Sequence, residues 1–235
     1  MRCYIEPRLR SAGSFIQSSG GLMKPIVSRA LIVVASILGI VFAQVAPASA
    51  QPSDDLASNL ATLWKKVIET PTNKSPIGTD SACWDLGHKT VAPFFGSPTL
   101  SCTVNADTTL FIAGWSTECS TIPGDDGGPG SSEDKLRKCA HDGVAAKLPT
   151  TITLVTPDGK DVPLTPTEVD TPALKIDLPK HNILGAPKGE YVSVADGYVV
   201  LLPPQTPGEY KIVIVNNADD PDHATTTTTR IVVTP

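Results

Sequence analysis

Basic residues are scarce in this sequence, and none of the common motifs of enzyme active sites occurs in it. The 235 residues include 19 Lys and Arg against 24 Asp and Glu, which gives a net charge of −5. An acidic protein is repelled by nucleic-acid phosphates and anionic lipid heads, so we expect neither as a partner. There is no G-x-S-x-G nucleophile turn, phosphate-binding Gly loop or dinucleotide fingerprint. We therefore expect no catalytic residues, no cofactor and no enzymatic activity.

Long apolar runs are also lacking, and the one near the N-terminus is typical of an export signal. Residues 30–43 are uncharged and mostly apolar, but they fall short of the roughly 20 residues that a membrane-spanning helix needs. Lys24 and Arg29 precede this run, and the small residues Ala48-Ser49-Ala50 follow it, as at a signal-peptidase site. We predict a signal peptide over residues 1–50 rather than an uncleaved membrane anchor.

Cleavage after Ala50 gives a mature chain that begins at Gln51. Met23 is an alternative start, because it gives a signal peptide of ordinary length. The mature chain keeps 14 Lys and Arg and 23 Asp and Glu, a net charge of about −9. The apolar run contains no Cys that could carry a lipid. We expect a protein in the medium or at the cell surface, with no membrane contact after cleavage.

Closely spaced cysteine pairs are absent as well. The mature chain keeps Cys83, Cys102, Cys119 and Cys139, none of them at the C-x-x-C spacing common in zinc sites. An even number of cysteines in an exported protein indicates disulfides instead. Of the three possible pairings we favour the sequential one, which closes two loops of roughly 20 residues, each bridge contributing about 3 kcal/mol.

Two short helices are expected. The first lies within residues 51–71, ahead of a single β-rich domain over 72–235, because apolar residues recur at helical spacing until Pro71 ends the pattern. A Gly- and Pro-rich stretch at 123–131 cannot hold regular structure, and we expect a flexible surface loop there. The second helix follows that loop, capped by Ser131 or Ser132 and running through Cys139 and His141 with Leu136 facing inward.

The rest of the mature chain is patterned for β-strands. Turn signals such as Pro157-Asp158-Gly159 and Asp196-Gly197 separate short apolar segments. Short strands at such even spacing are typical of a sandwich. The expected strands are Thr109–Ala113, Thr151–Val155, Lys160–Leu164, Tyr191–Ala195, Tyr198–Leu202, Glu209–Val215 and Thr225–Val233. We predict a mainly β fold, an immunoglobulin-like or jelly-roll-like sandwich with one or two short helices, braced by disulfides.

Aromatic residues make up only 5% of the sequence, and most of those in the mature chain are close together. They are Trp84, Phe94, Phe95, Phe111 and Trp115. We expect them to fill the core; an exposed binding platform is the alternative.

Potential metal ligands lie near one another in three places, but their spacing matches no standard site. The groups are Asp85 with His88, His141 with Asp142, and His223 with Asp219, Asp220 and Asp222. Asp125 and Asp126 do not have the spacing of a calcium loop. We predict no metal site.

Glycoside hydrolysis needs two carboxylates that face one cleft, and the available ones include Glu118, Glu168, Glu190 and Glu209.

Part of the N-terminal half resembles a family of exported bacterial proteins of unknown function. That family has an N-terminal Trp, then an Asn-Pro, Asp, Gly, Cys pattern and a Trp-Phe-Leu-x-Gly segment. Here the corresponding residues are Trp64, Ser75-Pro76, Asp80, Cys83, Phe94-Phe95-Gly96 and Cys102. Ser75 replaces the Asn, and Phe94-Phe95 replaces the Trp-Phe.

The C-terminal half carries a second likeness. Asp196-Gly197-Tyr198, the apolar run up to Pro203 and the segment Pro207-Gly208-Glu209-Tyr210 are similar to the signature that ends this family and many immunoglobulin-like sandwiches. A strand, a Pro-Gly corner and a returning strand explain it, so the resemblance implies a fold more than a function. The family brings no established activity or catalytic residues.

The sequence thus favours a non-catalytic secreted protein that binds an extracellular ligand, glycan or protein. The alternative is a secreted hydrolase acting on polysaccharide or cell-envelope material, with carboxylates or the Asp85 and His88 pair placed by the fold. A purely structural envelope component is a third possibility.

Overall fold

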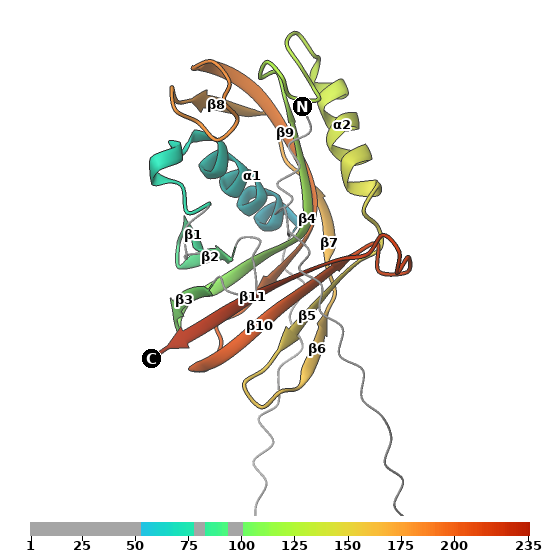
Figure 1. Ribbon diagram of the computed structural model, residues 1–235. Helices are drawn as coiled ribbons and strands as arrows, with labels where there is room; N and C mark the ends of the chain where they lie inside the picture. Colours follow the sequence, from blue (N-terminus) through green and yellow to red (C-terminus); the bar gives the residue numbers. More distant parts are fainter. Residues whose placement is uncertain (1–52, 78–82, 94–100) are drawn as a thin grey trace, which may run out of the picture. The chain divides into compact units, whose positions relative to one another are not determined.

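Two helices and eleven β-strands make up the described part of the chain (Figure 1). The computed structural model describes residues 53–77, 83–93 and 101–235. The predicted signal peptide therefore lies outside the described residues. The elements are α1 (Ser53–Glu69), a 3₁₀ turn (Thr72–Lys74), β1 (Cys83–Gly87), β2 (Thr90–Pro93), β3 (Ser101–Asn105), β4 (Thr109–Ser120), α2 (Glu133–Ala145), β5 (Thr150–Val155), β6 (Asp161–Leu164), β7 (Thr167–Asp170), β8 (Leu174–Leu178), β9 (Gly189–Leu202), β10 (Gly208–Asn216) and β11 (Thr225–Thr234).

The strands form two sheets. The six-stranded sheet has the order β1-β2-β4-β9-β7, with β8 also paired to β9, and the five-stranded sheet has the order β3-β11-β10-β5-β6. Most neighbours are antiparallel, but β2 pairs with β4 and β3 with β11 in parallel. The two sheets pack face to face, and the predicted mainly β sandwich with two helices and two disulfides is confirmed.

Strand β4 separates two parts of the core. Side chains alternate between the faces of a strand, so Leu110 and Ile112 pack against the five-stranded sheet while Phe111 and Ala113 face the other way. Helix α1 covers that second face with its buried apolar stripe of Leu56, Leu60, Leu63 and Val67. Full burial of a Leu side chain stabilises a fold by about 1.5–3 kcal/mol, which fixes the helix against the sheet.

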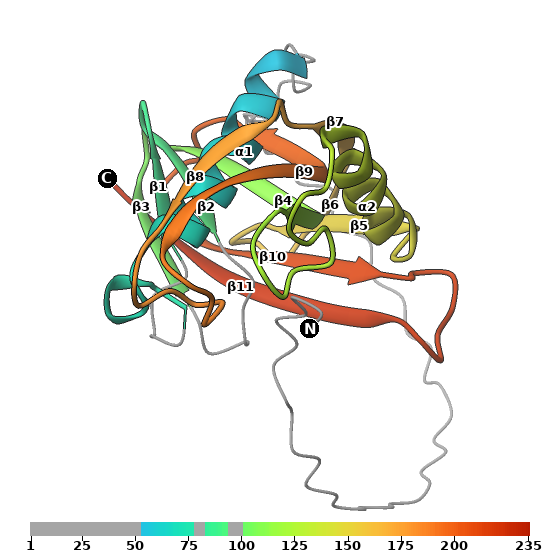
Figure 2. The same ribbon diagram turned by 90° about the horizontal axis from the view of Figure 1, so that it is seen from above.

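Helix α2 packs on the opposite face, at the other end of the long strands. Val194 contacts the α2 residues Leu136 and Ala140, whereas its neighbour Ala195 belongs to the cluster under α1. Adjacent strand residues point to opposite faces, so β4 and β9 run between the two helices, as Figures 1 and 2 show. The expected inward position of Leu136 is confirmed, since its side chain is fully buried.

Strand β9 corrects one sequence prediction. Asp196-Gly197 was expected to be a turn between two strands, but β9 is continuous for 14 residues. Its partner β4 extends to Ser120 and pairs on both sides of this dipeptide, with Ser116 opposite Gly197. A Cβ at Gly197 would lie 2.7 Å from the Cβ of Ser116, so Gly here permits close strand approach instead of a reversal.

Two disulfides connect the layers. Cys83 in β1 is bonded to Cys102 in β3, which ties one sheet to the other, and Cys119 in β4 is bonded to Cys139 in α2. This is the sequential pairing that the spacing favoured. Disulfides form and persist in oxidising compartments, which is consistent with an extracellular protein.

No helix in residues 53–77, 83–93 and 101–235 combines the length and the apolar character needed to cross a membrane.

The aromatic side chains divide between core and surface. Trp84 and Phe111 are buried in the core, as expected. Trp115 is half-buried, with its Nε1 donating to Gly143 O at 3.4 Å and Lys147 Nζ 5.4 Å from its ring centre. Phe94 and Phe95 lie outside the described residues.

Candidate functional site

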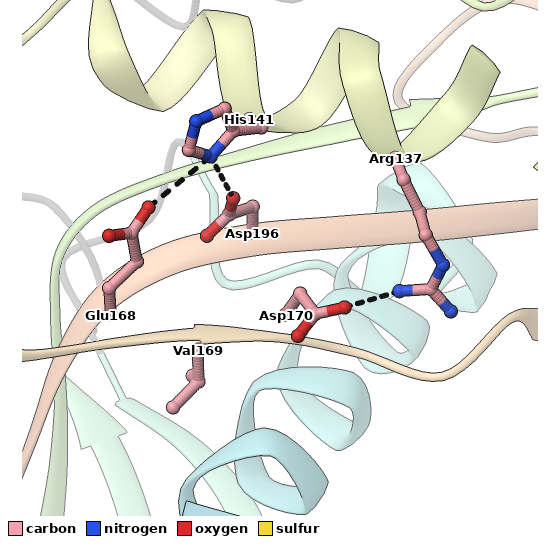
Figure 3. A pocket seen from close by; sticks show the side chains of 6 residues that line it. All are labelled: Arg137, His141, Glu168, Val169, Asp170 and Asp196. Atoms are coloured by element: carbon pink, nitrogen blue, oxygen red, sulfur yellow. Dashed lines mark hydrogen bonds and ion pairs between the residues drawn. The ribbon is translucent and has the colours of Figure 1, made fainter. Parts of the chain in front are cut away.

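Three titratable side chains meet where α2 crosses β7 and β9. His141 comes from α2, Glu168 from β7 and Asp196 from β9, and Figure 3 shows them pointing toward one another. His141 Nδ1 lies 3.1 Å from Asp196 Oδ2 and 3.3 Å from Glu168 Oε1. Within the described ranges this is the one group of three or more His, Cys, Asp or Glu side chains close enough to share a metal ion.

The register of β7 on β9 brings the carboxylates together. Glu168 pairs with Tyr198, and Asp170 pairs with Asp196. Because side chains alternate, these four residues share the face toward α2, while Val169 between them packs into the core under α1. The order along the chain gives no hint of this register, since β8 and a long loop separate β7 from β9.

Arg137 fixes the position of α2 over these strands. It lies four residues before His141 and therefore on the same face of the helix. Its Nη1 donates to Asp170 Oδ2 and to Thr171 O, the latter at 3.0 Å, while its Nη2 donates to Glu133 at 2.6 Å. The guanidinium is thus committed to structural contacts, and its position holds His141 over Asp196.

The two carboxylates have different surroundings. The side chain of Glu168 is 38% exposed, and its Oε2 accepts a hydrogen bond of 2.8 Å from the Tyr198 hydroxyl. The side chain of Asp196 is only 7% exposed, and its Oδ1 is buried without a hydrogen-bond partner. One carboxylate is therefore held at the surface, and the other is buried with half of its acceptor capacity unused.

These surroundings shift the pKa values in the cluster. Burial raises the pKa of Asp196, while the hydrogen bond to His141 lowers it. The backbone amide of Gly197 also lowers the pKa of Asp196, although it does not complete a hydrogen bond to Oδ1. The hydrogen bond to Asp196 and the charge of that residue raise the pKa of His141, whose side chain is 61% exposed. The hydrogen bond to Glu168 raises the pKa of Tyr198.

A surface hollow opens beside this cluster, with a volume of about 420 Å³. We call it the charged hollow; its lining residues are Arg137, His141, Glu168, Val169, Asp170 and Asp196. Five of these six side chains carry or can carry a charge. The hollow therefore suits a small polar or ionic ligand, or one charged group of a larger ligand, better than an apolar molecule.

The sequence singled out His141 but gave it the wrong partner. Asp142 points to Lys138, whose Nζ is 2.7 Å from Asp142 Oδ2, whereas His141 meets Glu168 and Asp196. Glu168 was noted only as an available carboxylate, and Asp196 was assigned to a turn. The spacing of Arg137 and His141 on one helix face was the available signal, but it could not identify the strand residues below them.

The other two groups of potential ligands named from the sequence lie apart from this site. Asp85 Oδ1 accepts from the Gly87 amide at 2.8 Å in the β1–β2 hairpin, where His88 adopts a left-handed φ of 51°. In the loop between β10 and β11, His223 Nδ1 lies 2.7 Å from Asp220 Oδ2, and this hydrogen bond lowers the pKa of Asp220. Both arrangements are local contacts within exposed turns.

Two further acidic residues turn out to be structural. Asp125 accepts hydrogen bonds from the amide and the hydroxyl of Ser120, the latter at 2.7 Å, which anchors the 123–131 loop to the end of β4. Glu118 is buried and accepts from the hydroxyl of Ser193. Burial, followed by the charge of Asp125, raises the pKa of Glu118 to about 8. Neither residue lines the charged hollow.

Comparisons with known proteins leave the family open. No protein-family model matches the sequence, and no curated protein matches it. Among solved structures, the solution structure of amebosin matches at 10% identity over 57% of this chain and 89% of that chain, with a TM-score of 0.22. A TM-score this low does not establish a common fold.

Proposed function

We propose that the protein is exported and acts outside the cell as a non-catalytic binding protein, with its ligand held in the charged hollow. The two disulfides indicate an oxidising compartment. The signal peptide predicted over residues 1–50 supplies the route of export. The net negative charge disfavours nucleic acids and anionic lipids as ligands.

The unused oxygen of Asp196 is the observation that carries the proposal. A buried acceptor without a partner costs about 1–3 kcal/mol, and Oδ1 of Asp196, a residue that lines the charged hollow, is such an atom. A ligand that brings a hydrogen-bond donor or a positive charge recovers the lost interaction, so the hollow favours ligands with cationic or donor groups.

Native mass spectrometry of protein recovered from the medium of the producing cells tests this function. We expect a mass that begins at Gln51, with both disulfides oxidised, and a bound species that remains through purification. Asp196→Asn should lose that species, because the amide halves the acceptor capacity and removes the charge. Asp161→Asn is the matched control, since Asp161 is exposed on β6 and does not line the hollow.

Other outcomes would overturn separate parts of the proposal. An unprocessed mass, or absence of the protein from both the medium and the cell surface, contradicts export. A bound species that survives in Asp196→Asn, or no bound species in any form, contradicts the assignment of the binding site. Recovery of the protein only in the insoluble cell-wall fraction would favour the structural envelope role instead.

A secreted hydrolase is the second candidate. Glu168 and Asp196 lie close together in unequal surroundings, one exposed and the other buried, and burial raises the pKa of Asp196; pairs of carboxylates in different surroundings are the catalytic groups of glycosidases. A panel of polysaccharides and cell-envelope fragments tests it. Turnover that disappears in Glu168→Gln and persists in Asp161→Asn would support the hydrolase and contradict a non-catalytic role.

A further inference from the structure

We propose that His141, Glu168 and Asp196 form a binding site for one divalent transition-metal ion of the zinc type. The ion would be the ligand of the charged hollow, or the anchor through which a larger ligand is held, so the inference rests on the proposed binding function and deepens it. Three elements contribute one side chain each: α2, β7 and β9.

The spacing of the ligand atoms fits such an ion. Atoms bound at 2.0–2.2 Å to a tetrahedral metal are about 3.3–3.6 Å apart, and an octahedral arrangement brings neighbouring ligands to about 2.8–3.1 Å. The Nδ1 atom of His141 lies 3.1 Å from Asp196 Oδ2 and 3.3 Å from Glu168 Oε1. The donor atoms of all three side chains are within 4.8 Å of one another. Small adjustments therefore suffice to close the three donors around an ion.

The hydrogen bonds in the cluster leave it electrostatically incomplete. Two carboxylate oxygens approach the same ring nitrogen, and Nδ1 can carry no more than one hydrogen. That hydrogen cannot satisfy Glu168 and Asp196 equally, and the two negative charges remain close together. A divalent cation neutralises both carboxylates at once and uses the lone pair of neutral His141.

Asp196 supplies an independent reason to expect a ligand. Its side chain is 93% buried, given the 7% exposure, it lines the hollow, and Oδ1 has no hydrogen-bond partner. Buried carboxylates are ordinarily paired, hydrogen-bonded or bound to metal, and this one is only half-paired. Coordination by Oδ1, alone or together with Oδ2, would complete it.

The residues around the three ligands are arranged as supports. The Tyr198 hydroxyl donates to Glu168 Oε2 at 2.8 Å, which leaves Oε1 directed at His141. Arg137 holds α2 through Asp170 and Thr171 O without using any of the three proposed ligands. Supports of this kind orient metal ligands and raise their affinity. The open side of the hollow leaves room for water or a donor atom of a larger ligand.

The donor set selects the class of ion. One imidazole with two carboxylates suits Zn²⁺, Mn²⁺, Fe²⁺ or Co²⁺, whereas Ca²⁺ prefers six to eight oxygen ligands and Mg²⁺ keeps most of its water. The two carboxylates also balance the charge of a divalent ion. Zn²⁺ and the spectroscopic probe Co²⁺ are therefore the ions to test.

Calorimetric titration of the secreted, disulfide-bonded protein with Zn²⁺, after treatment with a chelator, is the decisive experiment. We expect one Zn²⁺ per chain and a fall in affinity of at least tenfold in both His141→Gln and Asp196→Asn. Co²⁺ should give the visible absorption of a four- or five-coordinate ion in the unchanged protein and in neither of these two variants. His141 is mostly exposed, so His141→Gln leaves the fold intact, and circular dichroism checks this.

His223→Gln is the matched control, because His223 is an exposed imidazole that pairs with an Asp in another loop. Its affinity for Zn²⁺ should equal that of the unchanged protein. Absence of saturable Zn²⁺ binding, or equal affinity in His141→Gln, Asp196→Asn and His223→Gln, overturns the metal site. If Zn²⁺ does not bind but a co-purified organic ligand is lost in Asp196→Asn, the metal inference is wrong and the binding function stands.

Discussion

His141 on α2 and Asp196 on β9 meet with their side-chain atoms 3.1 Å apart, although 55 positions separate them in the chain. Together with the Arg137 contact to Asp170, this pair connects the second helix to the strands that it crosses. The contact joins an exposed imidazole to a buried carboxylate, so replacement of one residue should shift the pKa of the other.

The first prediction concerns the pKa of His141 in metal-free protein. The hydrogen bond to Asp196, followed by the charge of Asp196, raises this pKa above its ordinary 6.5. A raised pKa in the folded state means that the contact stabilises the fold below about pH 6.5 and that this contribution is lost as the pH rises through the folded-state pKa. An NMR titration of the imidazole should show a lower midpoint in Asp196→Asn and no change in Asp161→Asn. Equal midpoints in all three proteins would contradict the contact.

Glu118 gives a second dependence on pH, which has the same sign. Burial and the charge of Asp125 raise its pKa from 4.5 to about 8, so the folded protein keeps the proton that the unfolded chain releases. The free energy of unfolding should therefore fall as the pH rises from about 4.5 to about 8, by an amount on the order of 5 kcal/mol. Urea denaturation at pH 5 and pH 9 measures this fall.

Glu118→Gln is the test variant for this effect. Gln has no proton to lose and can still accept the hydrogen bond that Ser193 donates. The variant should be more stable than the unchanged protein at pH 9 and similar to it at pH 5. An equal loss of stability at pH 9 in both proteins would assign the effect to other groups.

Gly197→Ala tests the continuity of β9. The added Cβ would lie 2.7 Å from Ser116 Cβ and 3.0 Å from Trp115 O, both on the paired strand β4. The strands must separate to admit it, and we expect a loss of about 1–3 kcal/mol in urea denaturation. Unchanged stability would instead favour an exposed turn at this position, as the sequence alone predicted.

The parts of the fold that were predictable depend on local signals. The first helix has an apolar stripe and a Pro that ends it, and Pro157-Asp158-Gly159 gives the turn between β5 and β6. Strands β10 and β11 were found because their β-branched residues are contiguous. The cysteine spacing favoured the pairing that the structure has. In each case the residues that decide the structure are neighbours in the sequence.

The candidate site was not predictable for the same reason. Its geometry depends on the register that sets Asp170 opposite Asp196, and on the docking of α2 across that pair. Asp196-Gly197 also has the composition of a hairpin turn, and only the partner strand β4 prevents it from forming one. Long-range pairing overrode a strong local signal at the residue that matters most for the site.

Removal of the Cys83–Cys102 bridge should weaken the connection between the two sheets. The bridge joins β1 of one sheet to β3 of the other, and loss of a native disulfide of this loop length costs about 2–5 kcal/mol. Replacement of both cysteines by Ser should lower the thermal unfolding midpoint while circular dichroism retains its β signal. The Cys119–Cys139 double variant should leave the sheet connection intact and affect mainly the docking of α2.

Tyr198→Phe tests whether the hydroxyl on Glu168 supports metal binding. The tyrosine donates to Glu168 Oε2 at 2.8 Å and so directs Oε1 toward His141. Without the hydroxyl the carboxylate can rotate away, and the affinity for Zn²⁺ should fall about tenfold, because loss of an outer support typically weakens a metal site by 10–100-fold. Tyr191→Phe on the same strand is the matched control, since its hydroxyl donates to Pro187 O at 3.0 Å, outside the hollow. Equal Zn²⁺ affinity in the two variants would remove the support role of Tyr198, and with it one reason for placing Glu168 among the ligands.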